Sequence, residues 1–277
     1  MNGSFVEVTV SPDGAVAFIS HGGYESRNQS VTLLCKSAFE LVEPTKIRGK
    51  SFFISTDDIA CSVTGKVTFG FTRSENVIVC PDFTFDKWIE CGIDDYERTT
   101  SMILVNSQEP PVSEKLFWIG NPRTQELRFK LISLGIQNAE RLRIIPMNWL
   151  RDYSKGHKHR FTHYVSLEDH TKYKYLIDCG AAGFSGRLKF LLHSNRTLFL
   201  VDRQQNNREY FYDQLVPYEH FIPVAEHLHD LLAKITWADN HPSEAQQIAK
   251  NAKEFAIQYL SRRAAVEYFA KAIIENI

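Results

Sequence analysis

The sequence YKYLIDCGAAGFSGRLKFLL, residues 173–192, decides the fold class. Residues 173–179 are mostly apolar and predict a strand, which ends at the small residues 180–183 and is followed by a predicted helix. Small residues allow backbone N–H groups to approach a phosphate, and Arg187 can donate paired hydrogen bonds to a diphosphate. A tight turn that only packs the strand against the helix explains the same pattern. Both interpretations stay open at this point.

The same alternation of strand, turn and helix continues on both sides of this stretch. Short apolar runs predict strands at 116–119, 142–146, 197–201 and 221–224. A helix is predicted over 124–134, with Gly135 as its C-terminal stop. The C-terminal part of the chain is predicted to be helical, with a common stripe of Ala245, Ile248, Ala252, Phe255, Ala256 and Tyr259. This order predicts an α/β fold in which helices cover both faces of a parallel sheet.

The N-terminal part of the chain mixes short apolar runs with polar turns. Strands are predicted over 5–10, 51–55 and 77–80, and a helix over 31–41 that ends before Pro44. The stretch 105–113 contains two consecutive prolines and predicts a linker or a long connection. We therefore place a domain boundary after residue 110.

Composition and charge exclude several classes of protein. Of the 277 residues, 43% are hydrophobic and 23% are charged, the balance of an ordinary globular protein. A formal net charge of −1 provides no basic field for nucleic acid, and no apolar run has the length of a transmembrane segment. The five cysteines form no C-x-x-C pair and are expected to be reduced thiols. Together with the absence of a signal-peptide pattern, this predicts a cytoplasmic protein.

Several motifs carry a resemblance to a known family. The run LEDHTKYKYLID at 167–178 resembles the D-H-x-K-Y-K-Y-L motif of glycosyltransferase family 90, the CAP10 or KDEL-domain group, and Arg187 and Lys189 follow it at the family's spacing. EYFYDQLVPY at 209–218 and HFIPV at 220–224 match E-F/Y-F-Y-x-x-L-x-P-W/Y and H-Y/F-I-P-V. FWIGNPRT at 117–124 resembles F-x-G-x-R-T, and PDFTF at 81–85 matches P-x-x-T/S-F-x-W more loosely.

The resemblance implies a GT-B architecture, with two Rossmann-like domains and the active site in the cleft between them. On this plan 1–110 is the acceptor-side domain, 111–250 binds the nucleotide sugar, and 251–277 packs back on the N-terminal domain. The implied reaction is an inverting transfer from UDP-glucose or UDP-xylose to a hydroxyl of a glycan, such as a surface polysaccharide, lipopolysaccharide core or viral glycan. No metal or other cofactor is required, and the sequence lacks the Asp-x-Asp motif of metal-dependent transferases.

The resemblance also implies which residue acts as the general base. An inverting transferase needs a base to take the proton of the acceptor hydroxyl. The family's position falls on Asp58, or on Asp57 if the register is shifted by one residue. The alternative interpretation is that both carboxylates are solvated residues of a turn.

The donor site implied by the resemblance and by the small-residue turn contains Arg123, Thr124, His170, Gly183, Phe184, Ser185, Arg187 and Glu209. Without a metal, the charge of the departing UDP must be met by arginine, hydroxyl and amide groups. Glu209 is expected to accept hydrogen bonds from the ribose, and His170 to orient the donor phosphate or the acceptor. A carboxylate at a helix start and a core histidine are the respective alternatives.

The sequence also permits other interpretations of the chain. The basic run 155–160 with His163 suggests a metal site, but a solvated loop near the phosphates is favoured because no acidic or thiol ligand accompanies it. A dehydrogenase or methyltransferase would carry its glycine-rich turn near the N-terminus, not after residue 180. A non-catalytic sugar-nucleotide or glycan-binding module and a protein O-glycosyltransferase both stay open.

Overall fold

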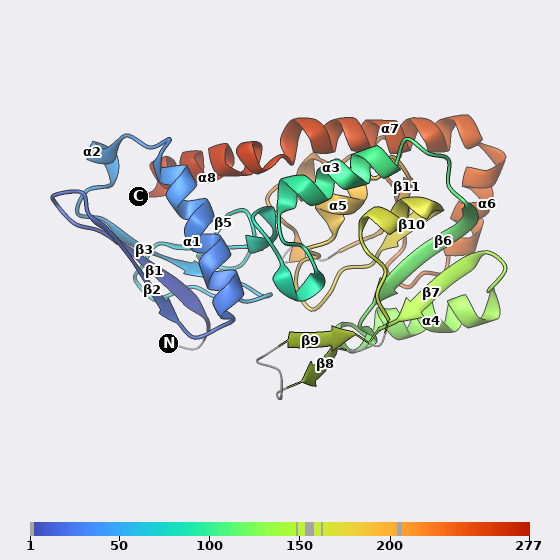
Figure 1. The fold of residues 1–277 in the computed structure, drawn as a ribbon, viewed down its shortest axis with the longest axis horizontal. Helices are drawn as coiled ribbons and strands as arrows, with labels where there is room; N and C mark the ends of the chain where they lie inside the picture. Colours follow the sequence, from blue (N-terminus) through green and yellow to red (C-terminus); the bar gives the residue numbers. More distant parts are fainter. Residues whose placement is uncertain (1–2, 148, 153–157, 162, 204–206) are drawn as a thin grey trace.

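The computed structural model describes residues 3–147, 149–152, 158–161, 163–203 and 207–277, and its two five-stranded sheets lie side by side (Figure 1). The first sheet has the order β2-β1-β3-β4-β5, with β1 Phe5–Val10, β2 Val16–His21, β3 Ser51–Ser55, β4 Thr68–Gly70 and β5 Ile78–Val79. β1 is antiparallel to β2 and β3, whereas β3, β4 and β5 are parallel. The first sheet is therefore mixed rather than purely parallel.

The second sheet is parallel throughout. Its order is β12-β11-β10-β6-β7, with β6 Ser113–Gly120, β7 Leu142–Pro146, β10 Tyr173–Asp178, β11 Thr197–Val201 and β12 Ile222–Val224. Both faces of this sheet are covered, so a central strand such as β11 is buried along its whole length. The predicted parallel sheet is confirmed. A hairpin of β8 Trp149–Asp152 and β9 Lys158–Phe161 lies outside it.

The α-helices of the described residues are α1 Glu25–Phe39, α2 Pro44–Ile47, α3 Tyr96–Asn106, α4 Leu127–Gln137, α5 Leu188–His193, α6 Leu231–Asn240, α7 Pro242–Tyr259 and α8 Arg262–Asn276. The stretch predicted as a linker begins inside α3 and ends in β6. Gly135 lies inside α4 rather than at its end, so the predicted stop is wrong. A Cβ on Gly135 would lie 2.6 Å from Cγ1 of Ile144, and glycine therefore allows α4 to pack closely on β7.

The C-terminal helices connect the two sheets (Figure 1). α7 packs against α5 and β11 of the second sheet, whereas α8 packs against α1 beside the first. The ring of Phe269 in α8 lies 5.6 Å from that of Phe69 in β4. The predicted stripe of α7 is buried except for Tyr259, which is 44% exposed. The chain therefore ends beside the sheet in which it begins.

One hydrophobic cluster is shared by the two sheets. It includes Phe52 and Phe69 of the first sheet and Leu176 and Leu198 of the second. A separate cluster fills the other face of the second sheet, beneath α4 and α6. The α/β architecture with two sheets, which the resemblance implies, is confirmed. No helix among the described residues has the length and apolar character needed to cross a membrane.

Candidate active site

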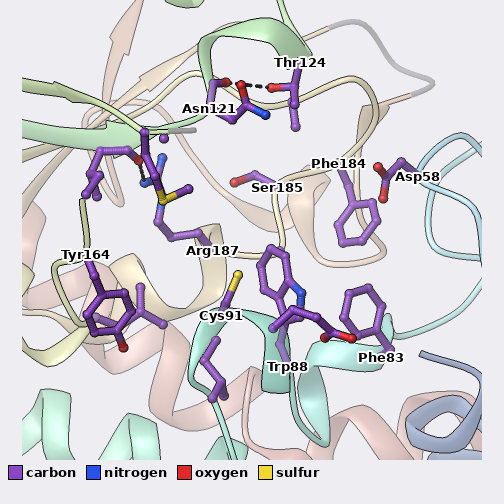
Figure 2. A pocket seen from close by; sticks show the side chains of 18 of the residues that line it. Asp58, Phe83, Trp88, Cys91, Asn121, Thr124, Tyr164, Phe184, Ser185 and Arg187 are labelled. Atoms are coloured by element: carbon purple, nitrogen blue, oxygen red, sulfur yellow. Dashed lines mark hydrogen bonds between the residues drawn. The ribbon is translucent and has the colours of Figure 1, made fainter. Parts of the chain in front are cut away.

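A cavity of about 510 Å³ opens between the two sheets (Figure 2). Its N-terminal wall includes Tyr24, Arg27, Asp58, Phe83 and Trp88, and its C-terminal wall includes Asn121, Thr124, His170, Phe184, Ser185 and Arg187. The C-terminal wall lies at the ends of β6, β7 and β10. Parallel strands present their C-terminal ends at one edge of a sheet, where ligands bind in open α/β folds. The cavity therefore lies at the edge where residues 180–187 form the turn that the sequence assigns to the donor, the donor turn.

Asp178, the last residue of β10, organises the turn behind the C-terminal wall. Its buried carboxylate accepts a hydrogen bond of 3.0 Å from the hydroxyl of Ser185 and pairs with Arg187 and Arg203. Burial raises the pKa of Asp178, but the two guanidinium groups outweigh burial and hold the pKa below its ordinary value. Asp178 is therefore ionised at neutral pH and holds both the hydroxyl and the guanidinium of the wall in place.

Arg187 reaches into the cavity from the end of the donor turn (Figure 2). Its guanidinium donates to the carbonyl oxygen of Ile119, lies 3.4 Å from Oδ1 of Asp178 and covers the ring of Trp118 at 5.9 Å. These contacts fix the side chain before a ligand arrives, and 16% of it stays exposed. A fixed guanidinium is suited to the oxygens of a phosphate or diphosphate.

His170 lies on the same wall as a neutral imidazole. Its Nδ1 lies 2.7 Å from the carbonyl oxygen of Ser166, which assigns the proton to Nδ1, and its ring meets that of Phe117 edge-on at 4.8 Å. Burial, followed by the nearby charge of Arg187, lowers the pKa of His170 to about 3. Nε2 has no hydrogen-bond partner among the described residues. The ring can therefore accept a hydrogen bond from a ligand.

The two candidate bases lie in different surroundings. Asp58 is on the cavity and forms an ion pair of 2.9 Å with Arg27, with 49% of its side chain exposed. Asp57 instead accepts a hydrogen bond of 2.8 Å from the backbone N–H of Ser4, beside β1. The structure thus places Asp58 on the cavity and Asp57 against Ser4, outside the residues that line the cavity.

The donor turn is pinned directly to the N-terminal wall. A Cβ on Gly183 would lie 1.8 Å from the carbonyl oxygen of Asp58, so the two backbones are in contact. The next residue, Phe184, meets the ring of Phe71 at 5.6 Å. Gly183, predicted as part of the donor site, therefore lets the two walls come into close contact. Phe184 lines the cavity and packs against Phe71 of the opposite wall.

A buried ion pair also joins the two walls. Nζ of Lys189 in α5 lies 2.7 Å from Oδ2 of Asp82 and 2.8 Å from the hydroxyl of Thr84, and the Lys189 side chain is 0% exposed. Lys189 is therefore not available to a ligand. It holds α5 against the segment of Asp82, Phe83 and Thr84.

Two further predicted donor residues, Arg123 and Thr124, lie in the turn after β6. Thr124 lines the cavity, and its hydroxyl donates to the carbonyl oxygen of Asn121 at 3.1 Å. Arg123 is exposed, and the structure places it outside the cavity lining. Its backbone N–H donates to the side chain of Asn121 at 3.0 Å, which gives Arg123 a part in shaping this turn.

Glu209 lies behind the wall rather than on it. Its buried carboxylate pairs with Arg203 at 3.1 Å, and Oε1 has no partner among the described residues. Burial raises the pKa of Glu209 to about 7, although the charge of Arg203 opposes this rise. Arg203 also pairs with Asp178. The structure thus links Glu209 to the donor turn through Arg203, outside the residues that line the cavity.

Sequence reasoning missed several residues of the site. On the N-terminal wall these are Tyr24 and Arg27, which follow no motif or periodicity, and Trp88, which stands one residue beyond the tryptophan position of the loosely matched P-x-x-T/S-F-x-W motif. On the C-terminal wall, Arg128 donates to the carbonyl oxygens of Gly180 and Asn121 and so anchors two turns. Asp178 carried a usable signal, because an acidic residue at the end of a buried strand points to the ligand edge of the sheet.

Metal ligands are not clustered in the described residues, where no group of three or more His, Cys, Asp or Glu side chains could hold one ion. In the basic run, residues 155–157 lie outside the described residues, and 158–160 form part of β9. The five cysteines, all within the described residues, form no disulfide.

Several known proteins are similar to this chain in sequence. The model of "Glycosyl transferase family 90" matches residues 66–276, so Arg27 and Asp58 precede the matched range. Protein O-glucosyltransferase 2 of Danio rerio is 32% identical over 61% of this chain and 34% of its own length. The O-glucosyltransferase rumi of Drosophila melanogaster is 26% identical over 76% of this chain and 54% of its own length. The chain thus spans between about a third and a half of these relatives. A solved glycosyltransferase from Rickettsia africae aligns with a TM-score of 0.45 and 8% identity, covering 94% of this chain and 85% of that one.

Proposed function

Because the chain belongs to glycosyl transferase family 90, we propose that it transfers glucose or xylose from a UDP-sugar to an acceptor hydroxyl. The observation that supports this most directly is the placement of opposite chemistry on the two walls of one cavity. Arg187 and Ser185 lie on the C-terminal wall, and the carboxylate of Asp58 lies on the N-terminal wall. An anionic leaving group and a hydroxyl that must lose a proton need these two kinds of partner.

The proposed reaction is a single displacement with inversion. The acceptor oxygen attacks the anomeric carbon, and the bond from that carbon to the diphosphate oxygen breaks, with its electron pair leaving on UDP. The proton of the acceptor hydroxyl moves to Asp58. Base and leaving group act from opposite walls, so the acceptor enters on the face of the sugar away from UDP, which inverts the anomeric centre.

We propose that the departing charge is met by protein groups rather than by a metal. Arg187 supplies a fixed cation for the diphosphate. The hydroxyl of Ser185 donates to Asp178 and that of Thr124 to the carbonyl oxygen of Asn121. These hydroxyls and neutral His170 can therefore accept hydrogen bonds from hydroxyl or N–H groups of the donor. Asp178 keeps Ser185 and Arg187 in position, which reduces the reorganisation needed as charge develops.

The acceptor is proposed to be a hydroxyl of a glycan. Tyr24, Phe83, Trp88 and Tyr164 give the cavity an aromatic lining that suits the apolar face of a sugar ring. A protein hydroxyl is the second candidate. It is favoured by the similar proteins of Danio rerio and Drosophila melanogaster, whose names describe O-glucosyltransferases.

The test is a panel of donors offered to the protein in the presence of EDTA. UDP-glucose, UDP-xylose, UDP-galactose and GDP-mannose are scored for binding by calorimetry and for release of the nucleotide. We expect UDP-glucose or UDP-xylose to bind and to release UDP slowly, with water as acceptor. Oligosaccharides and folded serine-containing domains, added in separate reactions, then distinguish the two acceptor classes by the product formed.

Three results would contradict the proposal in different ways. Binding of none of the UDP-sugars would remove the donor assignment. Turnover that appears only after a divalent ion is added would overturn the metal-independent mechanism. Donor binding without UDP release, unchanged by Asp58→Asn, would favour a non-catalytic sugar-nucleotide-binding module.

A further inference from the structure

Asp58 has a geometric problem as a catalytic base. Its side chain is 49% exposed at the edge of the cavity, and an exposed carboxylate samples several rotamers. A base contributes fully when it is held within hydrogen-bond distance of the proton that it removes. The structure must therefore supply groups that keep Asp58 directed at the cavity.

Arg27 fixes the carboxylate of Asp58. Its Nη1 lies 2.9 Å from Oδ1 of Asp58, which leaves Oδ2 without a contact to this guanidinium and available to an acceptor hydroxyl. Arg27 is itself immobilised, because its guanidinium lies 4.7 Å from the ring centroid of Phe83 and 5.0 Å from that of Tyr24. With 16% of its side chain exposed, Arg27 is the more buried partner and orients the more exposed one.

Gly183 fixes the backbone of Asp58. A Cβ at this position would lie 1.8 Å from the carbonyl oxygen and 2.6 Å from the carbonyl carbon of Asp58. Real Cβ atoms stay at least 3.0 Å away from such atoms, so any side chain here would move the two walls apart by about 1.2 Å. Gly183 is absent from the residues with positive φ, so glycine is needed for the close approach and not for its backbone freedom.

We propose that Arg27 and Gly183 are positioning residues that hold Asp58 at the donor, one through its carboxylate and the other through its backbone. This inference rests on the proposed role of Asp58 as base. It assigns functions to an arginine that precedes the range matched by the family and to a glycine that otherwise looks like part of a phosphate-binding turn.

A purely structural role would leave a different signature. An ion pair with a half-exposed carboxylate contributes little to stability, so loss of Arg27 is not expected to unfold the protein. If Arg27 instead contacted the donor, its loss would weaken UDP binding. Positioning predicts a fall in turnover with UDP affinity preserved.

The experiment compares variants of the full chain by UDP release from the UDP-sugar that the protein hydrolyses and by calorimetric affinity for UDP. Arg27→Met keeps a side chain between the two rings but removes the charge. We expect it to lower kcat about 10- to 100-fold, as a displacement of about 1 Å can do. The affinity for UDP should stay within about twofold of wild type, and Arg27→Lys should recover most of the lost rate. Gly183→Ala should lower kcat in the same way.

The double variant Arg27→Met with Asp58→Asn separates this inference from the proposed function. If Arg27 acts through Asp58, adding Arg27→Met to Asp58→Asn lowers the rate no further. Additive losses, a weakened UDP affinity, or full activity of both Arg27→Met and Gly183→Ala would overturn the inference while leaving Asp58 as the base. An unchanged rate in Asp58→Asn alone would instead overturn the base assignment itself.

Two controls exclude indirect effects. Arg263→Met removes another arginine–carboxylate pair, that with Glu267 on α8, where the arginine is 86% exposed. Gly65→Ala places a methyl group where nothing lies within 4 Å, but at a φ of +71°, so it strains the backbone without contacting Asp58. Both should keep the wild-type rate, and a loss of rate in either would overturn the interpretation of the test variants.

Discussion

The two walls of the cavity are built in opposite ways. Behind the C-terminal wall, the buried Asp178 pairs with Arg187 and Arg203 before any ligand binds. On the N-terminal wall, Arg27 and the half-exposed Asp58 stand among aromatic rings. Charges fixed in a low dielectric favour one anionic ligand, whereas a more open, aromatic wall can admit acceptors of different shape. We therefore expect the C-terminal wall, the donor wall, to recognise the common donor, and the N-terminal wall, the acceptor wall, to recognise the particular acceptor.

The largest effect that tests this comparison is the loss of Asp58. We expect Asp58→Asn to lower the rate of UDP release or transfer about 100-fold or more, the contribution of a general base, because asparagine cannot take the acceptor proton. The affinity for UDP should not change, since UDP is assigned to the other wall. Asp57→Asn is the matched control, and a comparable loss in that variant would shift the base by one residue.

The connection between the walls gives the next largest effect, this time on stability. Lys189→Met leaves Asp82 buried without its cation and should lower the free energy of unfolding by about 3–5 kcal/mol in urea denaturation. Adding Asp82→Asn should restore part of the loss. Lys172→Met, which removes an exposed pair with Asp169, should cost less than about 1 kcal/mol. Equal losses of unfolding free energy in Lys189→Met and Lys172→Met would show that the buried pair does not join the walls.

Removal of the fixed cation tests the donor wall itself. Arg187→Ala should weaken UDP binding by about 1.5–3 kcal/mol, the value of a charge-assisted hydrogen bond, measured by calorimetry. Arg123→Ala sharpens the comparison, because the sequence assigns Arg123 to the donor site and the structure places it outside the cavity. An unchanged affinity for UDP in Arg187→Ala, or an equal loss in both variants, would contradict the placement of Arg187 at the donor.

The smallest effect concerns the charge of Glu209 behind the donor wall. Its pKa of about 7 is raised by burial above the unfolded value, so its contribution to stability is complete below pH 4.5 and is lost as the pH rises through 7. Between pH 6 and 8, the free energy of unfolding of wild type should therefore fall by about 1 kcal/mol relative to that of Glu209→Gln, measured by urea denaturation. Comparing the two proteins at each pH cancels the opposite contribution of buried histidines such as His170. A constant difference would mean that Glu209 is already ionised at pH 6.

The donor wall was largely predictable from the sequence because its signals are local. Mostly apolar runs predict strands such as β10 and β11, and the small residues 180–183 mark the turn that follows β10. The depth of Glu209 could not be predicted, because burial depends on what packs over a residue and not on the motif around it. For the same reason, the sequence suggested a phosphate contact for Gly183, whereas the structure shows a contact with Asp58.

The acceptor wall was much less predictable because its parts come from distant segments. Arg27 lies near the start of α1, before the periodic residues from which that helix was predicted, and nothing in the sequence places it opposite Asp58. The edge strand β2 was also missed, since its residues are exposed or half-exposed and give no apolar alternation. Asp57 and Asp58 are equivalent in sequence, and the bond from Ser4 is what separates them.

The hydrophobic cluster shared by the two sheets has a consequence for how the protein melts. Because side chains from both sheets and from α8 interlock in one cluster, neither sheet can lose its packing while the other keeps its own. Calorimetry should accordingly record one cooperative transition rather than two. UDP bound to the second sheet would then slow amide hydrogen exchange in β1 and β3, so that a nucleotide shields strands that it never touches.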